Sequence, residues 1–219
     1  MTRRIAAITI GATPRPDLTD PLRLAVPADV EVREYGALDG WTGDPPPPAP
    51  GGYPLTTRAP DGRLVVADEA WLAPRVAAAV ARAEADGALV SVLLCAGGFD
   101  GISAEGALVR PFDLAVQLLH SLDVVAPGVL VPTAGQVSAS RDKWVAAGFE
   151  PLVRAGNPDD LARAFLADDG RAATWPILIV LDYVGHPDSI VEAARRLSPV
   201  PIVDLGSLAP TVVAATMRR

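Results

Sequence analysis

Apolar residues gather in six short runs along the chain, and polar residues with Gly or Pro separate them. Most of these runs are apolar at consecutive positions, which is typical of strands covered on both faces of a parallel sheet. We therefore predict strands over Ile5–Ile10, Val30–Tyr35, Leu89–Cys95, Val124–Val131, Ile177–Asp182 and Pro201–Val203.

Segments with helical periodicity lie between several of these strands. Residues 112–122 place Phe112, Leu119 and Leu122 on one face, and residues 190–197 show the same period. Residues 71–85 are rich in alanine, the strongest helix former. Strand–helix alternation of this kind predicts an α/β fold with a doubly wound parallel sheet.

Capping residues support two of the helix boundaries. Asn157 followed by Pro158 and two acidic residues is typical of a helix start. Ser207 is predicted to cap the last helix. That helix would end at Arg218 and Arg219, on the favourable side of its dipole.

One segment breaks the alternation. Residues 40–54 are rich in Gly and Pro, including Pro45–Pro48, and are predicted to form an extended loop. Residues 54–58 and 63–66 flank Ala59-Pro60-Asp61-Gly62, which predicts a β-hairpin. This insertion could be a flap, a dimer arm or an exposed connector.

Charge and composition narrow the partners. The chain has 219 residues and a net charge of −7, without the basic stripe that nucleic-acid binding requires. No apolar run reaches the roughly 20 residues of a membrane span. The single cysteine, Cys95, excludes a disulfide within the chain and favours a reducing, cytoplasmic location. Trp41, Tyr53 and the proline-rich segment are compatible with a homodimer or a higher homo-oligomer.

The end of the first strand carries candidate anion-binding residues. In open α/β sheets, ligands bind beyond the carboxyl ends of the strands. Thr9, Gly11, Thr13 and Arg15 supply two hydroxyls, a turn and a guanidinium, which suit a carboxylate or a phosphate. The alternative is an ordinary strand–helix turn with a surface arginine. Neither a GxGxxG nor a Walker A pattern is present, which disfavours a nucleotide.

The third strand ends in Cys95, followed by Ala96 and Gly97. Backbone N–H groups of a Gly-rich turn could stabilise an anion and favour the thiolate of Cys95. Such a thiolate could remove a proton next to a carboxylate. The alternative is a buried structural cysteine.

Two further strand ends carry polar side chains. Thr133 and Gln136 follow the fourth strand and could donate hydrogen bonds to a ligand or cap a helix. Asp182, Tyr183 and His186 follow the next strand, although His186 could also be a turn residue.

Several other site classes find little support in the sequence. His120 lies on a predicted helix and is expected to be structural. A hydrolase that uses His186 and Ser103 remains an alternative, without the GxSxG elbow that holds a serine nucleophile. Metal-ligand spacings are absent from the sequence, and no metal or cofactor is expected.

The ordered motifs resemble the AroM family over nearly the whole chain. The matching segments are Ala7–Asp17, Gly36–Gly40, Thr57-Arg58 with Asp61-Gly62, Leu93–Phe99, Pro132 with Gln136, and Leu181-Asp182 with Gly185. That family is similar to the aspartate/glutamate and hydantoin racemase superfamily, which includes maleate isomerase and arylmalonate decarboxylase.

The resemblance implies two pseudo-symmetric α/β lobes facing a cleft. The first lobe would comprise residues 1–110 and 205–219, with a hairpin insertion over 40–66, and the second lobe residues 111–204. The resemblance also implies cofactor-free chemistry by two cysteines, one at each of two matching strand ends. Cys95 matches the first of these cysteines.

The second of these positions is Tyr183, and the chain also departs from the family pattern at Ala12, Thr13 and Ala96. The resemblance therefore implies a one-base decarboxylase, isomerase or epimerase acting next to a carboxylate, with Cys95 on one face. Tyr183 or His186 would act on the other face. The alternative is a small-carboxylate-binding protein without catalysis.

Overall fold

The computed structural model describes residues 3–165 and 175–217, and the predicted helix end at Arg218 and Arg219 lies outside them. Contacts between Cα atoms divide the chain into two units. Unit 1 comprises residues 1–111 and 207–219, and unit 2 comprises residues 112–206.

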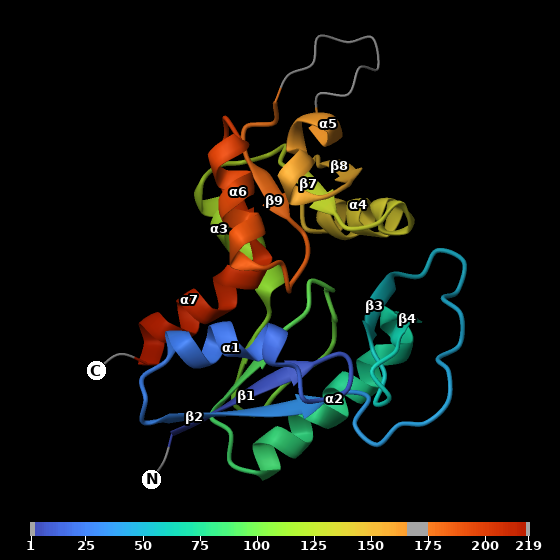
Figure 1. Ribbon diagram of the computed structural model, residues 1–219, viewed down its shortest axis with the longest axis vertical. Helices are drawn as coiled ribbons and strands as arrows, with labels where there is room; N and C mark the ends of the chain where they lie inside the picture. The colour runs from blue at the N-terminus through green and yellow to red at the C-terminus, as the bar shows by residue number, and fades with distance from the viewer. Residues whose placement is uncertain (1–2, 166–174, 218–219) are drawn as a thin grey trace. The chain divides into compact units, whose positions relative to one another are not determined.

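Unit 1 is built on a four-stranded parallel sheet with the strand order β2-β1-β5-β6. Helices α1 and α2 lie on opposite faces of this sheet (Figure 1). The elements are β1 (Arg3–Thr9), α1 (Pro16–Ala25), β2 (Val30–Gly36), α2 (Glu69–Ala85), β5 (Val90–Leu93) and β6 (Ala107–Val109).

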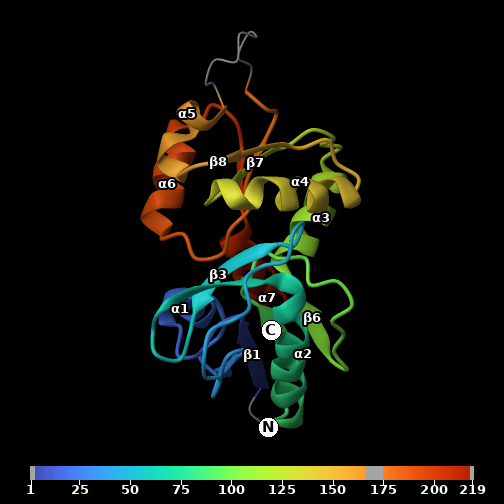
Figure 2. The ribbon, with the colours of Figure 1, turned by 90° about the vertical axis from the view of Figure 1, so that its right-hand side faces the viewer.

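Unit 2 is built on a second four-stranded parallel sheet, with the order β10-β9-β7-β8. Helix α4 covers one face, and α6 with the η2–α5 segment covers the other (Figure 2). The elements are α3 (Pro111–Ser121), β7 (Gly128–Val131), η1 (Ala134–Gln136), α4 (Val137–Ala146), β8 (Leu152–Ala155), η2 (Pro158–Asp160), α5 (Leu161–Phe165), β9 (Ile179–Leu181), α6 (Asp188–Leu197) and β10 (Ile202–Asp204).

The two sheets have the same topology. In each unit the second strand in chain order lies at one edge, followed by the first, third and fourth strands. The register agrees as well, because the N–H of Leu94 donates to the Ile8 carbonyl at 2.8 Å and that of Asp182 donates to the Leu130 carbonyl at 2.9 Å. The α/β fold with two pseudo-symmetric parallel sheets is thereby confirmed.

The predicted insertion forms a hairpin between β2 and α2. Strands β3 (Pro54–Arg58) and β4 (Leu64–Asp68) pair antiparallel around the predicted turn. The Asp68 carboxylate accepts hydrogen bonds from the N–H groups of Ala49 and Ala70, at 3.1 and 2.9 Å. The proline-rich loop is thus joined to the start of α2.

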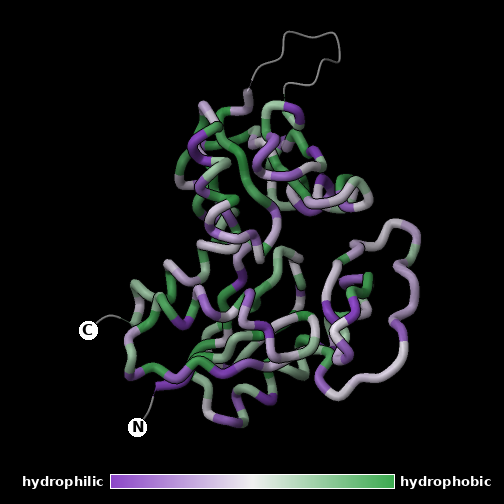
Figure 3. Tube along the Cα trace, in the orientation of Figure 1, coloured by the Kyte–Doolittle hydropathy of each residue, from purple (hydrophilic) through white to green (hydrophobic). Residues whose placement is uncertain are grey.

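The strands carry the apolar residues of each core. Figure 3 shows that hydrophobic stretches in both units alternate with hydrophilic ones. Ile5, Ile8 and Leu93 are fully buried in unit 1, as are Ile179 and Leu181 in unit 2. Within the described ranges, no helix is long and apolar enough to cross a membrane.

Several local predictions differ from the structure. The last helix, α7 (Leu205–Met217), begins two residues before Ser207, so the prediction that Ser207 caps it is wrong. Asn157 does precede a helical turn, but its side chain makes no capping hydrogen bond. Strands β6 and β8 lie in segments where no strand was predicted.

Candidate functional site

Cys95 and Tyr183 occupy matching positions in the two units. Cys95 follows Leu94, whose N–H donates to β1, the first strand of unit 1. Tyr183 follows Asp182, whose N–H donates to β7, the first strand of unit 2. The strand end that carries a thiol in unit 1 therefore carries a phenol in unit 2. The two strand ends carry different surroundings, which we describe unit by unit.

In unit 1, the turn after β5 wraps around the thiol. Cys95 is buried, with 6% of its surface exposed, and its Sγ accepts a hydrogen bond from the Gly97 N–H at 3.4 Å. The Glu69 carboxylate, from the first residue of α2, accepts from the N–H groups of Gly98 and Phe99 at 3.1 and 3.0 Å. A carboxylate of the chain itself thus occupies two amides that were expected to face a ligand anion.

Close packing explains the glycine in this turn. A Cβ on Gly97 would lie 2.4 Å from Glu69 Oε2 and 2.7 Å from the Phe99 ring. Ala96, the next residue after Cys95, is also buried, with 6% exposure. The turn presents a hydrogen bond to the sulfur, which stabilises a thiolate more than a thiol.

At the end of β1, the two predicted hydroxyls are engaged within unit 1. The Thr9 hydroxyl is fully buried and donates to the Gly11 carbonyl at 3.3 Å. Both the N–H and the hydroxyl of Thr13 donate to Asp39 Oδ1, at 2.8 and 3.0 Å. These threonines shape the turn, and their donors point to groups of the protein.

Arg15 is also engaged. Its Nε and Nη2 form a two-pronged ion pair with the Asp17 carboxylate, at 2.8 and 2.7 Å. Its backbone N–H donates to Glu34 at 2.6 Å. The hydrogen bond from Arg15 holds the pKa of Asp17 below its usual range. The predicted carboxylate-binding cation therefore already has an internal carboxylate partner.

The hairpin brings two further polar residues to this strand end. The Ala12 N–H donates to the Arg58 carbonyl at 2.9 Å. A Cβ on Gly11 would lie 2.3 Å from Thr57 Oγ1 and 2.7 Å from the Arg58 carbonyl oxygen, so only glycine allows this approach. Thr57 is 3% exposed, and its hydroxyl has no hydrogen-bond partner among the described residues.

In unit 2, Asp182 is the centre of a buried polar network. Its carboxylate accepts from Ser140 Oγ at 2.6 Å, Lys143 Nζ at 2.8 Å and Trp144 Nε1 at 3.0 Å. The Asp182 side chain is fully buried. It therefore joins α4 to the end of β9, and three donors of the protein already bind its carboxylate.

Tyr183 and His186 lie together after β9. Their ring centroids are 4.8 Å apart, with an angle of 56° between the planes. Burial lowers the pKa of His186, because desolvation disfavours the imidazolium. The sharp turn between them uses Gly185 at a φ of +119°. The structure therefore brings together these two predicted catalytic residues within unit 2.

The remaining predicted polar residues of unit 2 lie where the sequence indicates. The Thr133 hydroxyl donates to Gln136 Oε1 at 3.2 Å across the η1 turn. His120 stacks on Phe149 with centroids 4.6 Å apart, and its Nε2 donates to the Ala147 carbonyl, in keeping with a structural role. Ser103 lies exposed in the loop between β5 and β6 of unit 1.

Sequence reasoning missed Glu69, Thr57 and Arg58 as residues at these strand ends. Glu69 carried no signal, because its contacts with the Cys95 turn lie about 30 positions away in sequence. Thr57 and Arg58 did belong to a motif of the AroM resemblance, but the hairpin gave no indication of where it packs. Within the parts of the chain that are described, no cluster of His, Cys, Asp or Glu could hold a metal ion.

Comparison with known proteins agrees with this architecture. The family described as "AroM protein" matches residues 5–218, which confirms the resemblance of the motifs. A search of the curated proteins found no match.

Solved structures share the fold at low identity. Allantoin racemase from Klebsiella pneumoniae is 16% identical, covers 97% of this chain and 86% of its own, and gives a TM-score of 0.61. An arylmalonate decarboxylase is 17% identical, covers 98% of this chain and 91% of its own, and gives a TM-score of 0.62. A maleate cis-trans isomerase from Nocardia farcinica was solved with a covalently bound succinylcysteine intermediate. It is 14% identical, covers 98% of this chain and 92% of its own, and gives a TM-score of 0.57.

Proposed function

This chain belongs to the AroM family, and we propose that it is a cofactor-independent lyase or isomerase acting at a carbon next to a carboxylate. The fold neighbours include a decarboxylase, an isomerase and a racemase. The observation that carries the proposal is the hydrogen bond from the Gly97 N–H to Cys95 Sγ at the end of β5. It supports a thiol that can act as a base.

In the proposed reaction, the Cys95 thiolate takes the proton from the carbon next to the carboxylate. The electron pair of the broken C–H bond moves into the carboxylate and gives an enediolate. In a decarboxylation, loss of CO2 gives the same kind of intermediate, and the Cys95 thiol then delivers the proton. Hydrogen-bond donors that hold the carboxylate would stabilise the developing charge, usually the largest contribution to such catalysis.

For an isomerisation or epimerisation, we propose that Tyr183 or His186 delivers the second proton. An unperturbed phenol with a pKa near 10 can act as an acid but is a weak base at neutral pH. This asymmetry favours a one-base reaction over racemisation by two thiols. Thr133 and Gln136 are proposed to bind the substrate at the neighbouring strand end of unit 2.

Deuterium exchange tests the proposal without a known substrate. The protein is incubated in D2O with phenylmalonate and the two enantiomers of aspartate, and deuterium bound to carbon is followed by NMR. We expect enzyme-dependent incorporation into one of these compounds or its product, with a loss of at least about 100-fold in Cys95→Ala. Full incorporation by Cys95→Ala would contradict the role of the thiol.

Tyr183 favours a second candidate function, a carboxylate-binding protein without turnover. A phenol replaces the second thiol at the strand end of unit 2 that matches Cys95. This alternative predicts that one of the acids raises the melting temperature while no deuterium is incorporated. Incorporation that depends on Cys95 would exclude it.

A further inference from the structure

We propose that the β3–β4 hairpin supplies the carboxylate-binding group of unit 1, with Arg58 as its cation and the Thr57 hydroxyl as a second donor. This inference rests on the proposed function, because it assigns the residues that would hold the substrate carboxylate near Cys95. It also gives the insertion a role in ligand binding.

The first argument is the state of the charged groups at this strand end. Arg15 is paired with Asp17 through both prongs of its guanidinium, and only 10% of its side chain is exposed. In contrast, Arg58 is exposed, and no carboxylate in the described ranges forms an ion pair with its guanidinium. A ligand carboxylate can pair with Arg58 without breaking an internal ion pair.

The second argument is the buried hydroxyl. A buried polar group without a partner is rare in proteins and commonly marks a functional position. Thr57 Oγ1 is such a group, directed at the backbone of Gly11 in the β1–α1 turn. A hydroxyl can donate to a carboxylate oxygen. Thr57 lies on the buried face of β3 and Arg58 on its exposed face, so a shared carboxylate would bind at the end of the strand, where the long Arg58 side chain can reach it.

The third argument is position. The Ala12 N–H bonds to the Arg58 carbonyl, which fixes the hairpin at the end of β1. Strand β1 is the direct neighbour of β5, which leads to Cys95, and both chain segments leave the sheet at the same edge. Ala12, Ala59 and Cys95 belong to one hydrophobic core cluster.

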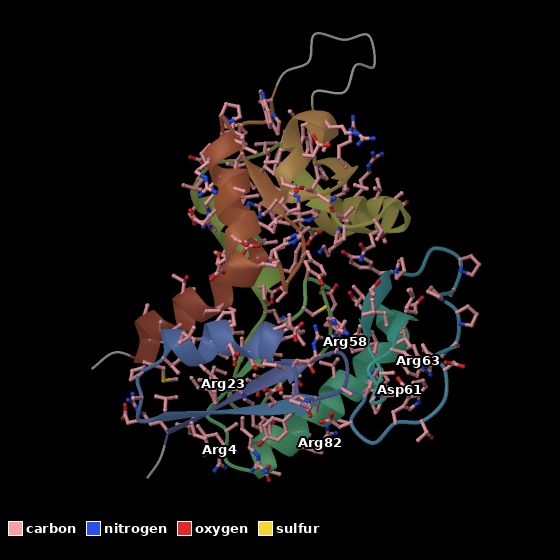
Figure 4. The ribbon with its side chains drawn as sticks, in the orientation of Figure 1. Arg4, Arg23, Arg58, Asp61, Arg63 and Arg82 are labelled. Carbon is pink, nitrogen blue, oxygen red and sulfur yellow. The ribbon has the colours of Figure 1, made fainter. Side chains whose placement is uncertain are left out.

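Figure 4 shows Arg58 on the side of the hairpin toward the ends of β1 and β5, whereas Asp61 and Arg63 lie on the side of the proline-rich loop. Arg63 pairs there with Asp61 and Asp44, at 2.6 and 3.1 Å. Two arginines of one hairpin thus have different surroundings, and Arg63 offers a matched control.

The test compares two alkylating reagents of nearly equal size, iodoacetate and neutral iodoacetamide, on the only cysteine of the chain. In both reactions the thiolate displaces iodide from the CH2 group and forms a C–S bond. Because the Glu69 carboxylate lies near Cys95, it would repel the negatively charged iodoacetate unless a cation of the protein binds the iodoacetate carboxylate.

We expect Arg58→Ala to lower the iodoacetate-to-iodoacetamide rate ratio by about tenfold, with the iodoacetamide rate unchanged. Thr57→Val, which keeps the side-chain shape, should lower the ratio by about threefold. Arg58→Lys should restore part of the ratio, and Arg63→Ala should leave it unchanged. An unaltered ratio in Arg58→Ala would overturn the inference.

A second measurement separates this inference from the proposed function. Binding of malonate is followed by calorimetry in the wild type, Arg58→Ala and Arg63→Ala. If Cys95 reacts with neither reagent, the proposed role of the thiol fails, whereas malonate binding lost only in Arg58→Ala would still support the hairpin site. Malonate binding that is absent, or equal in all three proteins, would overturn that site.

Discussion

Carboxylates of the chain itself satisfy many of the donors at the strand ends of unit 1. Asp39 binds both donors of Thr13, Asp17 binds Arg15, and Glu69 binds two amides after Cys95. These contacts limit where an incoming anion can bind. They are the reason that the hairpin residues, rather than the residues predicted from the first turn, carry our proposal.

Asp182 should be important for stability, because its carboxylate binds the buried ammonium of Lys143. Asp182→Ala leaves the Lys143 ammonium, only 8% exposed, without its carboxylate, and such losses cost about 3–5 kcal/mol. We expect the free energy of unfolding to fall by this amount, as measured by urea unfolding followed by tryptophan fluorescence. The double variant Asp182→Ala/Lys143→Met should recover part of it. Equal losses in the single and double variants would contradict the explanation.

His186 should make stability depend on pH. Burial lowers its folded-state pKa, so the unfolded chain binds the proton more readily. Its neutral form contributes fully above the unfolded pKa of about 6.5, and stability is lost as pH falls through that value and then through the lower folded pKa. Urea unfolding between pH 8 and pH 5 should show this loss reduced in His186→Gln. An identical pH profile in the variant would exclude His186 as the source of the pH dependence.

At the scale of single elements, the approach of the hairpin to the first turn depends on Gly11. Gly11→Ala would place a Cβ within 2.7 Å of a backbone carbonyl, and such overpacking costs about 1–3 kcal/mol. We expect faster proteolysis of the hairpin and weaker malonate binding. Gly135→Ala, in the turn after β7, is the control for proteolysis, because a Cβ there meets no atom within 4 Å. Equal effects of the two substitutions would contradict this packing.

The elements that the sequence predicts well are those with a clear strand pattern or a strong helix propensity. Strands β1 and β2 and helix α2 lie close to their predicted positions. Strand β6 was missed because it has three residues, and β8 because Arg154 interrupts its apolar pattern. Helix α1 contains Pro21 and was predicted only as an alternative to a binding turn.

The candidate site was predictable only in part, because side-chain partners depend on tertiary contacts. The sequence identified Cys95, Tyr183 and His186 at strand ends, where the structure places them. It could not show that Glu69 contacts the Cys95 turn, nor that Asp17 neutralises Arg15.

At the scale of the whole molecule, unit 1 is completed by residues from both ends of the described chain. Residues 207–217 of helix α7 belong to unit 1, where Ala209 and Val213 are buried, and Arg3 Nη1 donates to the Met217 carbonyl at 3.0 Å. Unit 2 comprises a continuous stretch of sequence between these parts.

Val213→Asp should therefore destabilise unit 1 selectively. Burying a carboxylate at a position that is 1% exposed should cost about 2–5 kcal/mol. Hydrogen exchange should become faster in β1 and β5, with less change in β7 and β9. Thr211→Asp, at an exposed position of the same helix, should leave both sheets protected. Uniform loss of protection in both units would show that they unfold together.

The place of α7 in unit 1 has a consequence for the chain during synthesis. All residues of unit 2 leave the ribosome before residues 207–217, the last described part of unit 1. Unit 2 can therefore reach its native form first, although unit 1 begins earlier in the sequence. Until residues 207–217 emerge, unit 1 lacks its last segment, and this is the interval in which a chaperone would protect the nascent chain.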